Sequence, residues 1–521
     1  MFLINLIIFV IVLGLIILIH ELGHFYFAKK AGILCHEFSI GMGPALYRKR
    51  KGETIYSVRS IPIGGYVSMA GESVSDALIR KDQVIGLKLN SDGIVTDIVL
   101  NPDLTFDIKG VVESFDLYGK EFDPLYITID TDGDVKRFSV LRDAKYVMSE
   151  KREMWITPSE KSFENKTLGQ RFMVIFAGPL MNFILAFVLF LFLSFFVLKP
   201  SLESSEINQI SPGSPAETIG LESGDIVTAI NGEDVNSWTD LSGIMATLTS
   251  PHATLLYTRD GIPTEVDAIL VVQIQTVGLA NRHADGSLYA DEPIIGTPFG
   301  RAATEGGLLP GDRITSISIN NESYMITDWD DIIAVFRIHP SGDVLINYLR
   351  DGEAGEATYP LISTRALGKL GYQAFIFQFG ITPTESFDLG YMLGYPFRSV
   401  YQSTNQVIQT IGLLFDPLED LGIRDLSGPV GIFGLVSNTA SQGFLSLVAF
   451  TAFLSINIGL LNLLPIPALD GGRLVFLGVE AITRRPLNRR LENSINNTMF
   501  FLLLGLFVYV TFNDIMRLFG G

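Results

Sequence analysis

The sequence predicts a polytopic α-helical membrane protein with four transmembrane helices, two extracytoplasmic α+β domains and a β-rich cytoplasmic insertion. Three observations support this fold class: four long apolar runs, clusters of basic residues beside them, and an internal repeat in the longest polar segment. Hydrophobic residues make up 48% of the 521 residues, and charged residues make up only 18%. This balance is typical of a membrane protein that also carries polar domains.

The four apolar runs are candidates for membrane-spanning helices, and they cover 2–19, 172–198, 444–464 and 499–512. The last run is shorter than the roughly 20 residues that a span needs, so we expect its polar flanks to extend the helix. The first run has neither a basic start nor a small-residue cleavage site, and we interpret it as a retained helix. The transmembrane segments are therefore predicted at 1–30, 172–198, 444–472 and 494–516.

Basic residues form three clusters beside these runs. They follow the first run, precede the second, and lie between the third and the fourth: Lys29, Lys30, Arg48, Lys49, Arg50, Lys51, Lys166, Arg171, Arg484, Arg485, Arg489 and Arg490. Because such clusters favour the cytoplasmic side of a membrane, four spans place both chain ends and the 199–443 segment outside the cytoplasm. We expect a multi-pass protein of the inner, or cytoplasmic, cell membrane.

The 199–443 segment contains an internal repeat. SPAETIGLESGDIVTAINGEDV at 214–235 is similar to GRAATEGGLLPGDRITSISINNESY at 300–324, and each copy has a Gly-Asp pair between a short helix and a β-rich run. The pattern resembles the PDZ domain, a fold whose sheet edge can bind an extended peptide as an added strand. We predict extracytoplasmic PDZ-like domains at 200–278 and 279–365, followed by an amphipathic linker region at 381–443.

A polar block at 72–165 lies between the first two spans. It alternates strand-like stretches with turn signals such as NSDG and TDGD, which predicts a β-rich insertion on the cytoplasmic side. The formal net charge of the whole chain is −18, and no basic stretch is dense enough for phosphate contacts, so we expect no nucleic-acid partner. Cys35 is the single cysteine, which excludes an intrachain disulfide.

The first apolar run ends in two histidines and a glutamate, which are costly at membrane depth. His20, Glu21 and His24 form the pattern H-E-x-x-H. On a helix, positions i and i+4 share one face, so both imidazoles can bind one metal while Glu21 lies beside the open coordination position. Zinc suits this ligand set. A metal-activated water needs a carboxylate that takes its proton and passes it to the leaving amine, and Glu21 is placed for that role.

A catalytic zinc usually has three protein ligands, so one more is needed. The stretch NLLPIPALDGG at 462–472 closes the third apolar run on the same side of the membrane, and its prolines break the helix. Such a break is tolerated at membrane depth where the freed backbone lines a cavity. Asp470 is the preferred third ligand. Cys35 and His36 are alternatives, whereas the three histidines of the extracytoplasmic domains are expected to have no metal role.

Taken together, the motifs resemble the site-2 protease family of intramembrane zinc metalloproteases, in its bacterial RseP branch. The resemblance rests on H-E-x-x-H in the first span, N-x-x-P-x-P-x-x-D-G in the third, and PDZ-like domains between the second and the third. Four further segments are similar to that branch: FSIGMGP (38–44), IPIGGYVSMAGE (61–72), FAGPLMNF (176–183) and SGPVGI (427–432). The insertion at 72–165 is longer than in compact members, so the resemblance gives it no function.

The resemblance implies a zinc metalloendopeptidase that cleaves peptide bonds within the membrane. The residues that it assigns to the reaction are Zn²⁺ ligands His20, His24 and Asp470 and the catalytic base Glu21.

The resemblance also implies how substrate is held. Asn462 would bind the substrate backbone, and Gly64 and Gly65 would contact substrate from a membrane-associated β-hairpin within 31–71. Substrates would be single-span membrane proteins, such as anti-sigma-factor-like proteins that a site-1-type protease has already trimmed, or remnants of signal peptides.

Two other classes of function fit parts of the sequence. The first is a membrane-anchored PDZ adaptor with a non-catalytic metal site, although such a site has no use for Glu21. The second is a transporter with an ion path through the intramembrane His and Glu residues. Four spans, no inverted repeat, and prolines at one helix end disfavour a transporter. We therefore predict regulated intramembrane proteolysis.

Overall fold

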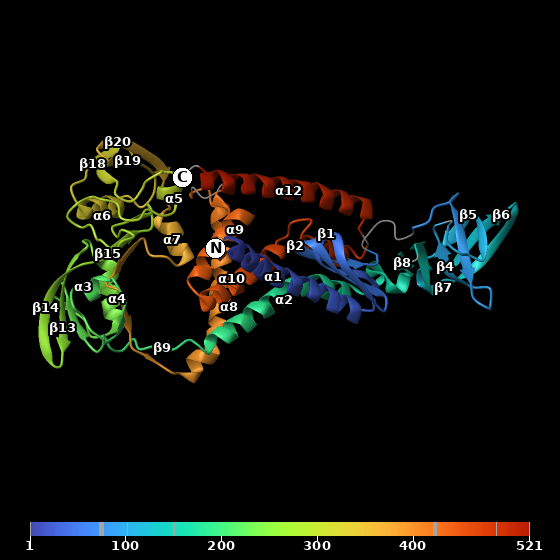
Figure 1. The fold of residues 1–521 in the computed structure, drawn as a ribbon, viewed down its shortest axis with the longest axis horizontal. Coiled ribbons are helices and arrows are strands. Elements are labelled where there is room, and N and C mark those ends of the chain that lie inside the picture. Colours follow the sequence, from blue (N-terminus) through green and yellow to red (C-terminus); the bar gives the residue numbers. More distant parts are fainter. Residues whose placement is uncertain are drawn as a thin grey trace. The chain divides into compact units, whose positions relative to one another are not determined.

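A computed structural model describes residues 2–71, 78–101, 103–149, 152–419, 422, 425–485 and 487–519 of the chain (Figure 1). The start of the predicted insertion, 72–77, lies outside the described residues, as do four positions of the predicted linker and both chain ends. The chain divides into two compact units. The first unit contains Met1–Leu189 and Phe433–Gly505, and the second contains Phe190–Ile432 and Leu506–Gly521.

Four of the described helices are long and apolar enough to cross a membrane: α1 (Phe2–Lys30), α2 (Leu168–Ser194), α10 (Phe444–Asn462) and α12 (Arg489–Phe519). They coincide with the four predicted apolar runs, which confirms that prediction. The 29 residues of α1 extend over about 43 Å, whereas the hydrocarbon core of a bilayer is about 30 Å thick. The helix is therefore long enough for its polar end to reach beyond the hydrocarbon.

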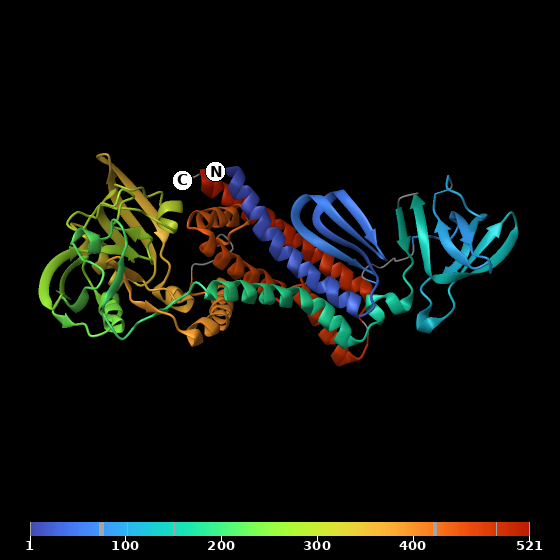
Figure 2. The ribbon, with the colours of Figure 1, turned by 60° about the horizontal axis from the view of Figure 1, so that its bottom comes forward.

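A folded hairpin follows α1 in the first unit. Strands β1 (Cys35–Lys51) and β2 (Thr54–Met69) are antiparallel, and residues 37–40 pair on one side with 55–58 and on the other with 65–68. The hairpin is thus bent back on itself into a small sheet, which lies along α1 in Figure 2. Its bends use glycines with left-handed backbone, including Gly41 and Gly64 at φ 84° and 88°. The 65–69 stretch forms one edge of this sheet.

An ion pair holds the bend of the hairpin together. Arg59 donates to Glu37 Oε1 over 2.7 Å, and the Ser57 hydroxyl donates to the same oxygen over 2.6 Å. Burial alone would raise the pKa of Glu37, but the hydrogen bonds from Ser57 and Arg59 outweigh burial and hold that pKa below its usual value. Glu37 therefore stays ionised and paired inside the sheet.

The polar block between the first two spans forms a small β-barrel. Its strands are β3 (Val84–Leu89), β4 (Val95–Val99), β5 (Ile108–Asp116), β6 (Tyr126–Thr131), β7 (Asp134–Ser149) and β8 (Arg152–Trp155). Their order is β4-β3-β5-β6-β7-β8, and a parallel pairing of β4 with β7 closes the first five into a ring. Short 3₁₀ helices η1 (Lys120–Phe122), η2 (Ser159–Lys161) and η3 (Phe163–Asn165) accompany it. The ring encloses an apolar core of its own.

Helix α11 (Asp470–Thr483) follows α10 after a break at 463–469. One apolar cluster joins the ends of α1, α2 and α11 to the hairpin; its members include Ala28, Cys35, Met69, Val174 and Leu477. The cluster fixes four separate chain segments beside the end of α1.

Two modules in the second unit repeat one arrangement. The first repeat module has β10 (Ile207–Ile210), α3 (Pro215–Thr218), β11 (Ile226–Ile230), β12 (Glu233–Asp234), α4 (Trp238–Thr247), β13 (His252–Arg259) and β14 (Ile262–Ile269). The second has α5 (Arg301–Thr304), β17 (Arg313–Ile319), β18 (Glu322–Met325), α6 (Trp329–Ile338), β19 (Asp343–Arg350) and β20 (Glu353–Pro360). Their sheets have equivalent orders, β12-β11-β13-β14 and β18-β17-β19-β20.

The Gly-Asp pairs seen in the sequence repeat have the same role in both modules. Asp225 and Asp312 are each 1% exposed. Asp225 accepts hydrogen bonds from Arg259 over 2.8 Å, and Asp312 accepts them from Arg350 over 2.7 Å. A buried carboxylate requires such a partner. Each Asp therefore ties the start of one strand to the end of its neighbour, β11 to β13 in the first module and β17 to β19 in the second.

The remaining strands of the second unit join segments from both sides of the second module. They are β15 (Val271–Ile274), β16 (Leu279–Ala280), β21 (Phe375–Gln378), β22 (Ile381–Pro383), β23 (Glu385–Ser386) and β9 (Lys199–Pro200). Strand β21 pairs with β15, β22 pairs with β10, and β23 pairs with β9. The chain therefore reaches and leaves the two modules through one antiparallel pair. Helices α7 (Thr364–Leu370), α8 (Leu389–Leu414) and α9 (Pro429–Ser441) complete the described elements.

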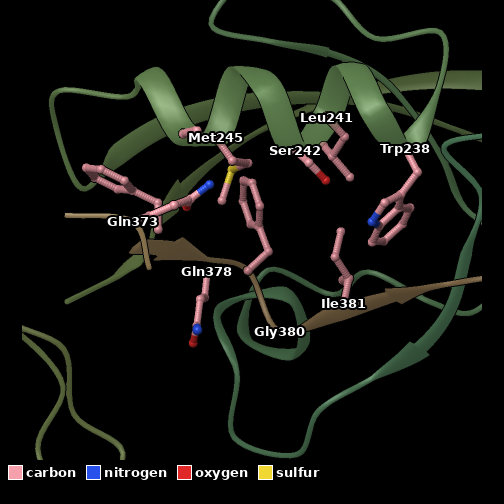
Figure 3. A pocket seen from close by; sticks show the side chains of 11 residues that line it. Trp238, Leu241, Ser242, Met245, Gln373, Gln378, Gly380 and Ile381 are labelled. Carbon is pink, nitrogen blue, oxygen red and sulfur yellow. The ribbon is translucent and has the colours of Figure 1, made fainter. Parts of the chain in front are cut away.

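The first repeat module contains a groove of about 430 Å³ between α4 and the β21–β22 segment. Figure 3 shows Trp238, Leu241 and Met245 pointing from α4 toward Gly380 and Ile381 on the other wall. The groove is therefore built from a helix of the repeat and a strand that returns from beyond the second module.

Candidate metal centre

Helix α1 presents two histidines on one face. His20 and His24 are four residues apart, so their side chains project in the same direction from successive turns. Both are 8% exposed. Their Nε2 atoms face each other at 3.2 Å.

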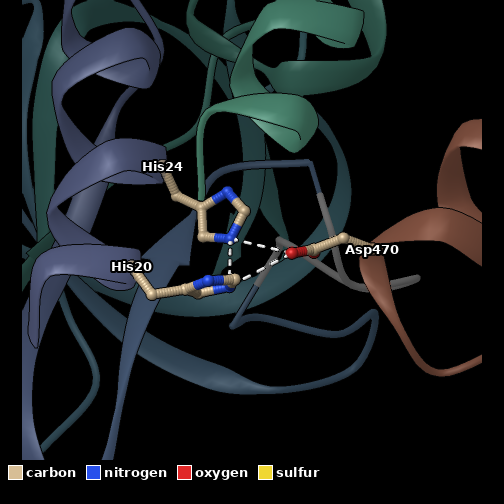
Figure 4. Close-up of side chains that lie close together, drawn as sticks. All are labelled: His20, His24 and Asp470. Atoms are coloured by element: carbon tan, nitrogen blue, oxygen red, sulfur yellow. Dashed lines mark hydrogen bonds and ion pairs between the residues drawn. The ribbon is translucent and has the colours of Figure 1, made fainter. Parts of the chain in front are cut away.

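Asp470 reaches the same point from the far end of the chain. Its Oδ2 atom lies 3.1 Å from His20 Nε2 and 3.3 Å from His24 Nε2 (Figure 4). Among the residues that the structure describes, these three form the one group of side chains with the spacing of metal ligands. The structure thus brings together the three residues that the sequence predicted as ligands.

The nitrogen and oxygen atoms that face one another in this cluster suit a bound cation. His24 Nδ1 lies 2.8 Å from the Val174 carbonyl oxygen and must donate its proton there, so the His24 Nε2 lone pair faces the cluster. The buried Asp470 Oδ2 has no hydrogen-bond donor of good geometry among the described residues. Lone pairs held this close repel one another unless a cation lies between them. Tetrahedral zinc with ligands at about 2.0–2.1 Å separates them by about 3.3 Å, close to the observed spacing.

Glycines allow the helices to approach the cluster. A Cβ atom added at Gly178 of α2 would lie 2.3 Å from His24 Nε2 and 2.8 Å from His20 Nε2. A Cβ at Gly23 of α1 would lie 2.3 Å from the Ala177 carbonyl oxygen. All three distances are far shorter than van der Waals contact. The close packing of α1 against α2, and the space around the ring nitrogens, therefore require glycine at both positions.

The break before α11 delivers Asp470 to the histidines. Helix α10 ends at Asn462, and Ala468 adopts left-handed backbone with φ 73°. A Cβ added at Gly471 would lie 2.1 Å from the Leu464 carbonyl oxygen, so the first turn of α11 packs directly on the backbone of the break. Asn496 of α12 accepts a hydrogen bond from the Ala468 amide over 3.1 Å. These contacts fix the direction of the chain just before Asp470.

A partly buried ion pair links the helices on the other side of the cluster. Arg171 Nη1 of α2 lies 2.8 Å from Glu480 Oε1 of α11, and their side chains are 17% and 21% exposed. Because α2 contacts the histidines and α11 begins with Asp470, this pair helps to fix Asp470 relative to the two histidines.

The predicted base and substrate-binding residues have different surroundings. Glu21 is half-buried, and a Cβ added at Gly65 would lie 3.3 Å from Glu21 Cγ and 2.8 Å from the Ser39 carbonyl oxygen. The hairpin edge therefore passes directly beside Glu21. Gly64 lies against Met42 at the bend of the hairpin. The side-chain amide of Asn462 donates to the Ile458 carbonyl within its own helix over 3.0 Å.

The alternative ligands lie elsewhere. Cys35 is buried in the apolar cluster at the end of α1, and its thiol points to the Ile33 carbonyl oxygen at 3.7 Å. His36 Nε2 is 3.4 Å from the Thr157 hydroxyl. Neither belongs to the described metal-ligand group.

Sequence reasoning missed the residues of α2 that surround the histidines. Val174, Gly178 and Asn182 all contact His20 or His24. An asparagine within an apolar run of membrane length is a candidate functional residue, and this signal was present in FAGPLMNF.

Comparison with known proteins identifies the class. The family model described as Peptidase family M50 matches residues 8–506, and the chain belongs to this family. Its apolar helices, together with this membership, define a multi-pass membrane protein of the site-2 protease class.

Among individual proteins, the chain is similar to two proteins named Zinc metalloprotease RasP. It is 33% identical to the one from Shouchella clausii over 515 residues, which cover 98% of this chain and 99% of that protein. It is 32% identical to the one from Oceanobacillus iheyensis over 514 residues, which cover 98% of both chains.

Substitution Gly178→Ala should disrupt the metal centre, because the new methyl group would occupy the space between the two rings. We expect roughly a tenfold or greater loss of zinc affinity, the effect of disturbing a metal site's supporting residues. Zinc affinity of the purified protein is measured by competition with a chelator. Gly169→Ala is the control, since a Cβ there meets nothing within 4 Å on the same helix. Equal affinity in both variants would contradict the described packing.

Substitution Asp470→Ala should lower the zinc content of the purified protein to a small fraction of the wild-type value, because it removes one of three ligands. Cys35→Ala should leave zinc content unchanged. Elemental analysis of the protein measures both. A loss of zinc in Cys35→Ala and retention in Asp470→Ala would move the third ligand to the segment after α1.

Proposed function

We propose that the chain is an intramembrane zinc endopeptidase that cleaves single-span membrane proteins. The observation that carries the proposal is the convergence of His20, His24 and Asp470 on one point, with Glu21 next to it on α1. Membership of Peptidase family M50 and the names of the relatives support hydrolysis of peptide bonds as the reaction.

The chain's own residues divide the work of hydrolysis. His20, His24 and Asp470 would hold a zinc ion, which when bound would lower the pKa of a water molecule and polarise the scissile carbonyl. The Glu21 carboxylate takes a proton from that water and returns it to the nitrogen of the leaving amine. Because Glu21 follows His20 directly on α1, the base and the two histidine ligands share one rigid helix, which keeps their mutual geometry constant during the reaction.

Substrate must reach this site in an extended form, since a helical peptide bond is shielded by its own hydrogen bonds. The 65–69 edge of the hairpin pairs on one side with 35–40 and has no strand on its other side among the described residues. An extended substrate segment added to this edge would pass beside Glu21. In this proposal Gly65 leaves room for the substrate backbone, Gly64 shapes the bend, and Asn462 holds the substrate from α10.

The two repeat modules fit a role in substrate selection. We assign them as PDZ-like domains on the extracytoplasmic side, because the basic clusters place the zinc end of α1 toward the cytoplasm. On this topology the modules act on access and not on the chemistry. A compact domain of this size is about 25 Å across, so a pair of them would exclude partners with bulky extracytoplasmic domains. Substrates would then be single-span proteins already trimmed by a site-1-type protease, or signal-peptide remnants.

A membrane-anchored PDZ adaptor remains the second candidate function. The groove between α4 and β22 supports it, because this space can receive a peptide. The adaptor would bind membrane proteins without cutting them, and the glutamate beside the histidines would have no task.

Glu21→Gln tests the reaction directly. The amide keeps the size of the side chain but cannot accept and return a proton, so cleavage of a single-span substrate should fall about 100- to 10,000-fold. Zinc content should equal that of the wild type. Glu233→Gln, at an exposed position of the first module, is the matched control. Cleavage at the wild-type rate by zinc-loaded Glu21→Gln would remove the assignment of the base.

Removing the two repeat modules distinguishes two roles for them: exclusion of substrates with bulky extracytoplasmic domains, and capture of substrates by peptide binding. Strand β9 is hydrogen-bonded to β23, and the Ser201 amide donates to the Thr384 carbonyl over 2.7 Å, so a short Gly-Ser loop can replace 201–384. Under exclusion, the shortened protein still cleaves a substrate with a short extracytoplasmic segment and newly cleaves one with a long segment. In contrast, Ser242→Trp fills the groove in the intact protein and should change neither rate. Loss of short-substrate cleavage in both variants would favour capture.

A further inference from the structure

One face of α2 surrounds both histidines. Val174, Gly178 and Asn182 are spaced by four residues, so they lie along one side of the helix. Gly178 leaves space for the two Nε2 atoms. Val174, one turn before Gly178, contacts His24, and Asn182, one turn after it, contacts His20. This arrangement gives each histidine its own partner at the ring nitrogen that faces away from the cluster.

The partner of His24 is the backbone. His24 Nδ1 lies 2.8 Å from the Val174 carbonyl oxygen, which can only accept a hydrogen bond. The proton of neutral His24 is therefore on Nδ1, and Nε2 is free to bind a metal. No side chain is needed for this choice of tautomer.

The partner of His20 is a side chain. The amide nitrogen of Asn182 lies 3.3 Å from His20 Nδ1, and Asn182 is fully buried. The other end of the same amide, Oδ1, is buried without a hydrogen-bond partner among the described residues. A carboxamide turned about its Cβ–Cγ bond exchanges oxygen for nitrogen with almost no change of shape. Asn182 can therefore either donate to Nδ1 or accept from it.

Helix α10 holds Asn182 in place. The Ser455 hydroxyl donates to the Asn182 backbone oxygen over 2.8 Å. A Cβ added at Gly459 would lie 3.1 Å from Asn182 Cβ, so α10 closes on this residue from the opposite side. The side chain has little freedom other than the turn of its amide.

We propose that Asn182 is a positioning residue for the metal centre: its Oδ1 accepts the Nδ1 proton of His20 and so directs the His20 Nε2 lone pair to the metal. Helix α2 then sets the tautomer of both histidine ligands, through a backbone carbonyl for one and a side-chain amide for the other. Such partners orient the ring and raise the basicity of the ligating nitrogen. This inference rests on the proposed zinc centre and adds a residue that supports it.

Two substitutions separate hydrogen bonding from packing. Asn182→Leu keeps a similar volume and removes the acceptor, so zinc affinity should fall about 10- to 100-fold. Asn182→Asp keeps an acceptor at Oδ1 and should bind zinc at least as tightly as the wild type. The full-length protein in detergent is titrated with zinc against a chelator, and cobalt(II) in place of zinc reports ligand geometry through its visible absorption. Thr451→Val is the control, since among the described residues this buried hydroxyl on α10 bonds to the Leu447 carbonyl of its own helix and to no other group.

The outcomes distinguish this inference from the proposed function. Weak binding by Asn182→Leu, with wild-type affinity and cobalt spectrum in Asn182→Asp, supports the positioning role. Equal affinity of Asn182→Leu and wild type overturns it but leaves the zinc centre intact, and so does an equal loss in the Leu and Asp variants. Where Asn182→Leu does not fold, Asn182→Ala, which only removes atoms, takes its place under the same criteria. Absence of zinc binding in the wild type would overturn both proposals.

Discussion

The close approach of three candidate metal-binding atoms is the constraint on which the helices around the site depend. Two imidazole nitrogens and one carboxylate oxygen lie 3.1–3.3 Å apart in a largely buried place. Without a cation this arrangement is unfavourable, because buried polar atoms without donors lose their hydration and gain nothing in return. The surrounding structure holds the atoms there nevertheless. Gly23 and Gly178 let α1 and α2 approach closely, and the ion pair between Arg171 and Glu480 ties α2 to α11.

The position of Asp470 depends on an interrupted helix. Backbone without helical hydrogen bonds is costly at membrane depth unless other groups satisfy it. Here the Ala468 amide donates to Asn496, and Gly471 packs on carbonyl oxygens of the break. The proline-containing stretch after Asn462 thus becomes a compact turn that starts a new helix at the metal centre. The hairpin edge places Gly65 beside Glu21, so the two histidines, the proposed base and the proposed substrate strand all take their positions from α1.

Local patterns in the sequence predicted the four apolar helices and the three candidate ligand residues. The four apolar runs predict helices because length and hydropathy act within a single segment. His20 and His24 are related by helix periodicity alone, and Asp470 follows from the helix break. The partners on α2 could not be predicted in the same way. FAGPLMNF shows that Gly178 and Asn182 lie on a helix, but which residues they contact depends on how α2 packs against α1 and α10.

Pairing between strands that are far apart in the sequence could not be predicted either. The repeat in the sequence predicts two similar modules, and the matching roles of Asp225 and Asp312 agree with it. It gives no sign that β21 and β22, which lie after the second module, pair with β15 and β10. The sequence also gives no sign of the parallel pairing of β4 with β7 that closes the barrel. Asn462, predicted to hold substrate, bonds within its own helix in this structure, so its proposed role requires the amide to change partner.

We propose that His20, His24 and Asp470 together hold one zinc ion. X-ray absorption at the zinc edge of the purified full-length protein tests it most directly, because it reports the ligand atoms without reference to activity. We expect nitrogen and oxygen neighbours at about 2.0–2.1 Å, with the outer scattering of two imidazole rings and no sulfur. A sulfur neighbour at about 2.3 Å, or a signal from a single imidazole, would contradict the ligand set.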